Sequence, residues 1–115
     1  MRRAGVLAPP RLVGARSAAR QFMRGYLRFA YGEAPASSVR AVGPALRRQL
    51  RQRALIAPAE RSRHPRLISL EVSGEKTGVV LATAIIDDGG IASYAVRVTV
   101  CRTRSRWLVS AVDGG

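Results

Sequence analysis

The sequence predicts an α+β fold, in which a long N-terminal helix and short helices pack on a curved four-stranded antiparallel sheet. Apolar residues alternate with other residues over 94–100, which is the period of a strand with one buried face. Over 18–31 the apolar residues instead recur at the period of a helix. Because the helical segments precede the strands, the order of elements favours helices covering one face of a sheet.

The first helix is predicted over residues 18–31 by the signals at its two ends. Ser17 is a favourable N-cap, and Gly32 is a favourable residue just past the C-terminus. Phe22 and Tyr26 lie on one broad apolar face of this segment. We therefore expect an amphipathic helix with its apolar side laid on the sheet.

The remaining helical region and the N-terminus are predicted from proline, glycine and charge. Residues 1–16 combine four arginines with Pro and Gly, which predicts a flexible basic lead-in to a single domain over 17–115. Pro44 is placed at the first position of a second helix, where its missing N–H costs nothing. Leu46 and Leu50 are then expected to point inward.

Four consecutive strands are predicted over 66–73, over 79–86 and, as a hairpin turning at Arg104-Ser105, within 91–112. The turn residues at 87–90 are expected to pair Thr83 with Tyr94, and the last hairpin to pair Val100 with Val109. The two hairpins then share one buried face, made of Val79, Leu81, Thr83, Ile85, Tyr94, Val96, Val98, Val100, Trp107, Val109 and Ala111.

The opposite face of the predicted sheet holds too many small and apolar residues for a surface in water. Val80, Ile86, Leu108 and Val112 are its candidate interface residues. Contiguous exposed apolar patches usually mark an interface, so homodimerisation through this face, or docking into a larger assembly, is expected. The alternative is that a helix or the N-terminal segment folds back over the face.

Charge is the most unusual bulk property, with a net charge of +13 carried by 20 basic and 7 acidic residues. Such a balance favours anionic partners. The candidate anion or nucleic-acid residues are Arg16, Arg20, Arg24 and Arg28, at intervals of four on the first helix, with Arg47, Arg48 and Arg51 on the second. Periodic arginines could follow phosphates, which makes nonspecific nucleic-acid association one hypothesis; an ordinary solvated helix face is the other.

The sequence offers no convincing set of catalytic residues. Thr83, Tyr94, Trp107 and His64 are the candidates for lining a pocket, and their convergence would support a small-ligand protein or an isomerase or dehydratase. The pair Asp87-Asp88 is interpreted as a turn rather than a metal site. We expect a non-catalytic protein with no metal and no cofactor.

The lone Cys101 excludes an intramolecular disulfide. No apolar run approaches the roughly 20 residues of a membrane span. As written, the sequence predicts a cytoplasmic protein without a membrane partner. A start further upstream that included a membrane helix would make it membrane-associated.

The order of elements resembles the nuclear transport factor 2-like superfamily. The similarity rests on an amphipathic helix ending in Phe29-Ala30-Tyr31-Gly32, a meander of strands, and a last strand opening with Arg106-Trp107-Leu108-Val109. It covers about residues 17–113 and implies a cone in which the sheet wraps around the helix. More faintly, the arginine-rich module resembles TcpC-type conjugal transfer domains, which implies a protein–protein association role in a conjugation or envelope-associated machinery.

Overall fold

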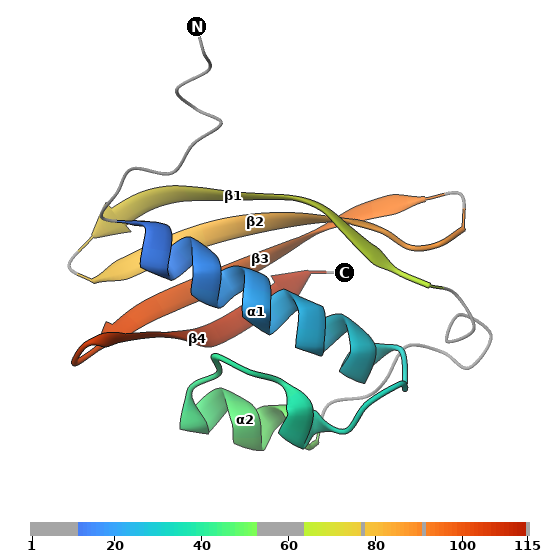
Figure 1. The fold of residues 1–115 in the computed structure, drawn as a ribbon, viewed down its shortest axis with the longest axis horizontal. Helices are drawn as coiled ribbons and strands as arrows, with labels where there is room; N and C mark the ends of the chain where they lie inside the picture. The colour runs from blue at the N-terminus through green and yellow to red at the C-terminus, as the bar shows by residue number, and fades with distance from the viewer. Residues whose placement is uncertain (1–11, 53–63, 77, 91, 115) are drawn as a thin grey trace, which may run out of the picture.

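The computed structural model describes residues 12–52, 64–76, 78–90 and 92–114, and places the long helix across the sheet with the second α-helix beside the last strand (Figure 1). Its helices are α1 (Val13–Ala30), the short 3-10 helix η3 (Ala36–Ser38) and α2 (Pro44–Leu50). Its strands are β1 (Arg66–Lys76), β2 (Val79–Asp87), β3 (Ser93–Thr103) and β4 (Arg106–Gly114). Neighbouring strands are antiparallel and the order is β1-β2-β3-β4, so the predicted α+β class and meander are confirmed.

Helix α1 begins at Val13, earlier than predicted, and Ser17 lies within the helix rather than at its cap. Leu12 and Ala15 are buried, so packing against the sheet sets the start of the helix in place of a capping side chain. Gly14 allows this approach, because a Cβ at that position would lie 2.8 Å from Cδ1 of Trp107. Part of the predicted lead-in is therefore helical, and residues 1–11 lie outside the described residues.

Helix α2 begins at Pro44, as predicted, with Gly43 in the extended conformation before it. Leu46 and Leu50 are fully buried, which confirms their inward direction. The segment before α2 also joins the sheet, because the amide of Gly43 donates to the carbonyl of Val109 and the amide of Val109 donates to the carbonyl of Ala41. The edge of β4 is thus partly covered by this segment.

The prediction for the faces of β2 is wrong. Tyr94 pairs with Ile86 rather than with Thr83, which is a shift of three residues between β2 and β3. An odd shift moves every side chain of a strand to the other face of the sheet. The buried residues of β2 are consequently Val80, Ala82, Ala84 and Ile86, and the predicted inward set of Val79, Leu81, Thr83 and Ile85 faces away from the helices.

The loop between β2 and β3 explains this register. The Asp88 carboxylate accepts hydrogen bonds from the amides of Gly90, at 2.6 Å, and Ala92, at 3.4 Å, and the Asp88 amide donates to the Ala92 carbonyl. These bonds stabilise a wider loop than the turn assumed from the sequence, so the last paired residues are Asp87 and Ser93. The Asp87 carboxylate accepts a hydrogen bond from the Gly89 amide at 2.9 Å, so both aspartates serve the turn, as predicted.

Bulges change the faces of β1 and β4 locally. The two-residue turn at Arg104-Ser105 and the pairing of Val100 with Val109 are as predicted, but the register then shifts at Ser110, so Val98 pairs with Val112 instead of Ala111. Val112 is therefore buried and Ala111 is exposed. The register shift in β1 between Leu67 and Ser69 likewise leaves Ile68 56% exposed, while Leu67 packs against the core.

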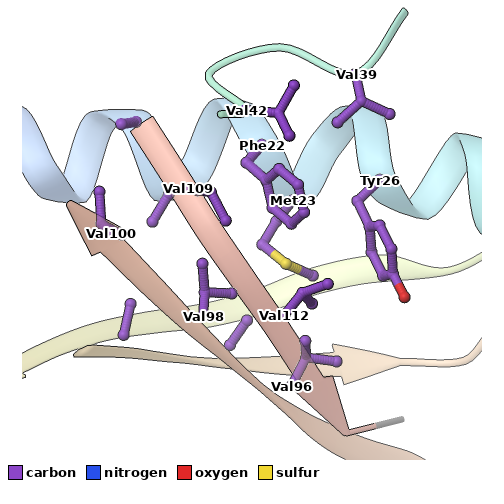
Figure 2. Packing of buried hydrophobic residues seen from close by; sticks show 14 of the residues in the cluster. Phe22, Met23, Tyr26, Val39, Val42, Val96, Val98, Val100, Val109 and Val112 are labelled. Carbon is purple, nitrogen blue, oxygen red and sulfur yellow. The ribbon is translucent and has the colours of Figure 1, made fainter. Parts of the chain in front are cut away.

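The core lies between α1 and the sheet (Figure 2). Phe22 and Met23 of α1 are fully buried, and the ring of Phe22 stacks on that of Tyr26 with centroids 5.3 Å apart. Figure 2 shows these side chains over the valines of β3 and β4, including Val98 and Val109. Small residues in α1 and at Ala82 and Ala84 of β2 allow the helix to lie close to the sheet.

Candidate functional site

The face of the sheet opposite the helices is apolar and is not covered by the described residues. Leu81 is 54% exposed and Val79 37% exposed on this open face. Half-buried Ile85 and Leu108 lie on the same side by strand alternation. We use the name open face for the sheet surface built from these residues and their neighbours Thr83, Ala95, Arg97, Thr99, Cys101 and Ser110.

An apolar face opposite the helices was predicted, but most of its candidate interface residues lie elsewhere. Val80, Ile86 and Val112, three of the four candidate interface residues, are buried in the core under α1. Only Leu108 lies on the open face, and its exposure is intermediate. The reason is the shifted register of β2 and the bulge at Ser110, which exchange the two faces at these positions.

A row of charged residues crosses the open face. Glu71 pairs with Thr83, Thr83 with Arg97, and Arg97 with Asp113, so the four residues lie side by side on neighbouring strands. Glu71, Arg97 and Asp113 are all exposed. The row therefore carries one cation between two anions, in contrast to the arginine-rich helical side of the molecule.

The arginines of α1 form one wall of a groove. Arg20, Arg24 and Arg28 line it, together with Leu27 of the same helix. The opposite wall consists of residues 64–67 at the start of β1, and the groove has a volume of about 430 Å³. Burial, and then the charges of Arg16 and Arg24, lower the pKa of Arg20. The predicted stripe is therefore real, and it borders a hollow rather than an open helix surface.

Arg47 does not belong to the anion-binding candidates. Its guanidinium donates to the carbonyls of Ala36 at 3.2 Å, Ser37 at 3.3 Å and Val39 at 2.7 Å. These bonds hold η3 and the following residue against α2. The prediction of Arg47 as an anion-binding residue is therefore wrong, whereas Arg48 and Arg51 are exposed.

The four pocket candidates do not converge. Thr83 lies on the open face, whereas Tyr94 lies on the core side near one end of the sheet. Trp107 packs on Gly14 near the other end and lines a second hollow of about 680 Å³, together with Ser17, Gln21 and Arg40. His64 is exposed and lines the arginine groove. The four residues therefore do not line one pocket.

Tyr94 instead belongs to a partly buried cluster that the sequence did not indicate. Its hydroxyl lies 3.1 Å from that of Tyr31, which is buried. Burial, followed by the hydrogen bond to Tyr31, raises the pKa of Tyr94, and the charges of Tyr26 and Asp88 contribute further. The fold brings these residues together from the end of α1, the loop after β2 and the start of β3. No pattern within one segment could reveal that arrangement.

The raised pKa of Tyr94 predicts a loss of stability at high pH. The folded state retains the phenolic proton more strongly than the unfolded state, whose tyrosines titrate at about pH 10. The Tyr94 contribution is therefore fully present below that pH and is lost as the pH rises above it. We expect the free energy of unfolding in urea to fall less steeply between about pH 9 and pH 11.5 in Tyr94→Phe than in the wild type. Equal slopes would contradict this assignment.

Within the described ranges, no three His, Cys, Asp or Glu side chains group in a way that could hold a metal ion. Among the same residues, no helix combines the length and the apolar character needed to cross a bilayer.

The fold and these surfaces define a small basic α+β protein with an apolar open sheet face and an arginine-lined groove on its opposite, helical side. No protein-family model, curated protein or solved structure matches the chain.

Proposed function

We propose that the protein is a non-catalytic association module that forms a homodimer by packing the open faces of two copies together. The observation that carries this proposal is the exposed apolar surface around Leu81 and Val79, which are 54% and 37% exposed. When one face of an antiparallel sheet is in water, its strands ordinarily place polar residues on that face. The apolar surface therefore favours a protein partner.

The size of the open face suits a dimer. Four strands about 4.8 Å apart, each of about ten residues at about 3.3 Å per residue, give a plan area of roughly 600 Å². Because the side chains protrude from the sheet, the solvent-accessible area of the face is larger than this flat area. A standard interface takes about 800 Å² from each partner, so nearly the whole face would be needed.

Edge-to-edge association is less favoured than packing of the faces. The edge strand β1 carries register shifts after Leu67 and after Ser73, and irregular edges hinder pairing with another strand. At the other edge, β4 is bonded to the segment before α2 through Ala41 and Gly43. The uncovered face is therefore the better candidate surface.

The charges favour a second copy as the occupant. The row of Glu71, Arg97 and Asp113 is self-complementary, because a two-fold axis can place Arg97 of one copy opposite Asp113 or Glu71 of the other. The helical side carries Arg16, Arg20, Arg24 and Arg28 and would repel another copy. Packing of the open faces keeps these arginines on the outside of the dimer.

We also propose that the fold is a small form of the nuclear transport factor 2-like cone. Support comes from the long helix lying across a four-stranded meander and from Trp107 at the start of the last strand, packed on the helix at Gly14. Dimerisation through sheet faces is common in that superfamily, so this kinship is in keeping with the proposed association.

The test is the mass in solution of Leu81→Asp. A charge placed at the centre of an apolar interface is strongly unfavourable. We therefore expect the wild type to have twice the 12.4 kDa mass of one chain, and Leu81→Asp to have the mass of one chain. The measurement is light scattering after size exclusion, with circular dichroism to verify folding.

Val13→Asp is the matched control, since Val13 is 56% exposed but lies on α1, and it should remain dimeric. Leu81→Thr, which introduces a β-branched residue that favours strands and adds no charge, should weaken the dimer if Leu81→Asp fails to fold. A monomeric wild type, or an unchanged dimer in both Leu81 variants, would refute the proposal.

A further inference from the structure

We propose that the groove between α1 and the start of β1 binds the phosphodiester backbone of single-stranded nucleic acid, without selecting its bases. This inference is independent of the dimer proposal. The groove is lined by Arg20, Arg24 and Arg28, with His64 on its other wall. It lies on the helical side of the sheet, so it stays accessible when two open faces pack together.

The spacing of the three arginines suits a repeating anion. Residues four apart on an α-helix are separated by about 6 Å along its axis, so Arg20 and Arg28 are about 12 Å apart along the groove. A nucleic-acid strand presents a phosphate at every step, which allows successive phosphates to meet successive guanidinium groups. The planar guanidinium also matches two oxygens of one phosphate.

These arginines are available for an anion. No described carboxylate forms an ion pair with Arg20, Arg24 or Arg28, although Glu33 lines the end of the groove. The lowered pKa of Arg20 reflects partial burial and the neighbouring charges of Arg16 and Arg24. A bound anion would relieve that repulsion. By contrast, Arg66 already pairs with the Asp87 carboxylate, at 3.3 Å, so we do not include Arg66 among the phosphate-binding residues.

The shape of the site favours a single strand over a duplex or a membrane. A volume of about 430 Å³ can enclose a short stretch of chain. Duplexes are read by elements that protrude into their grooves, and a bilayer is contacted by protruding cations with apolar side chains beside them. Here the cations line a hollow, and Leu27 beside them is buried.

The lining also predicts a lack of base selectivity. Among its described residues the groove has aliphatic and charged side chains and His64, but no Phe, Tyr or Trp on which a base could stack. Binding should therefore come from phosphates alone and fall steeply with salt. We expect an abasic oligodeoxyribonucleotide to bind within about threefold of oligo-dT of the same length.

The experiment is fluorescence anisotropy with labelled oligo-dT over a salt series, comparing two triple variants of equal charge. One variant carries R20Q, R24Q and R28Q in the groove; the matched control carries R48Q, R51Q and R102Q at exposed positions elsewhere. For single strands each phosphate contact contributes about 0.7 to the slope of log affinity against log salt. The groove variant should lose about 2 from this slope, and the control variant should retain the wild-type slope.

Competition experiments distinguish single-stranded nucleic acid from other anionic partners. Polyglutamate of equal charge, duplex DNA and vesicles containing phosphatidylserine serve as competitors, and each should compete more weakly than oligo-dT. Equal losses in both triple variants, stronger competition by any of these three, or no binding by the wild type would overturn the proposal. Circular dichroism verifies that the variants fold. R24K retains the charge but loses the planar guanidinium, so it should bind more weakly while retaining the wild-type salt slope.

Discussion

Replacing Ile86 with Ala is expected to cost about 3 kcal/mol of the free energy of unfolding, whereas the same replacement at Ile85 should cost about 1 kcal/mol or less. The two isoleucines are adjacent in β2 and point to opposite faces of the sheet. Ile86 is fully buried under α1, and Ile85 is half-buried on the open face. Truncating Ile86 therefore leaves a cavity in the core, while truncating Ile85 does not.

The measurement is urea unfolding of both variants at several protein concentrations. Because a dimer is stabilised by mass action, the comparison is made at the lowest concentration, where an open-face interface contributes least. A larger loss at Ile85 than at Ile86 would mean that β2 has the face predicted from its sequence. It would contradict the observed pairing of Ile86 with Tyr94.

Replacing Arg47 with Ala should destabilise the fold by about 2 kcal/mol, because hydrogen bonds from a charged donor are the stronger ones and the acceptors are backbone carbonyls. The guanidinium serves three of these, at Ala36, Ser37 and Val39. Removing it leaves the carbonyl groups of η3 and its C-cap without these donors.

The adjacent Arg48 provides the control, since it is exposed and belongs to the same helix. Arg48→Ala should change the free energy of unfolding by no more than about 0.5 kcal/mol. Thermal or urea unfolding compares the two variants. Equal effects would show that the bonds of Arg47 contribute no more than an ordinary surface charge.

The sequence predicted the order of elements because its local signals were strong. Val96, Val98 and Val100 alternate with polar or small residues, and they are buried as expected. The tight turn at Arg104-Ser105 likewise fixes the pairing of Val100 with Val109. These features depend on neighbouring residues alone.

The face of β2 could not be predicted in the same way because both of its faces are apolar. Val79, Leu81 and Ile85 alternate with Val80, Ala82, Ala84 and Ile86, so hydrophobicity does not distinguish inside from outside. The choice depends on the loop that Asp88 stabilises, and the number of residues in that loop sets the register.

The candidate sites were likewise predicted where the signal is local and missed where it depends on tertiary packing. The stripe of Arg20, Arg24 and Arg28 follows from a spacing of four on a helix, and it was predicted. The opposite wall of the groove, including His64, comes from tertiary packing against the β2–β3 loop: a Cβ on Gly89 would lie 2.6 Å from the His64 amide nitrogen. No local pattern indicates such a contact.

The most direct test of the association surface uses Cys101 as a probe of the open face. Its thiol is half-buried, and its sulfur lies 3.2 Å from the Ser110 hydroxyl oxygen. We expect the alkylation rate of Cys101 to fall as the protein concentration rises through the dimer dissociation constant, and to stay constant in Leu81→Asp.

A rate independent of concentration, in samples whose scattering mass has doubled, would show that the dimer uses another surface. Slow alkylation in a monomer would indicate that another segment of the same chain covers the face. Either result would contradict the proposed packing of two open faces.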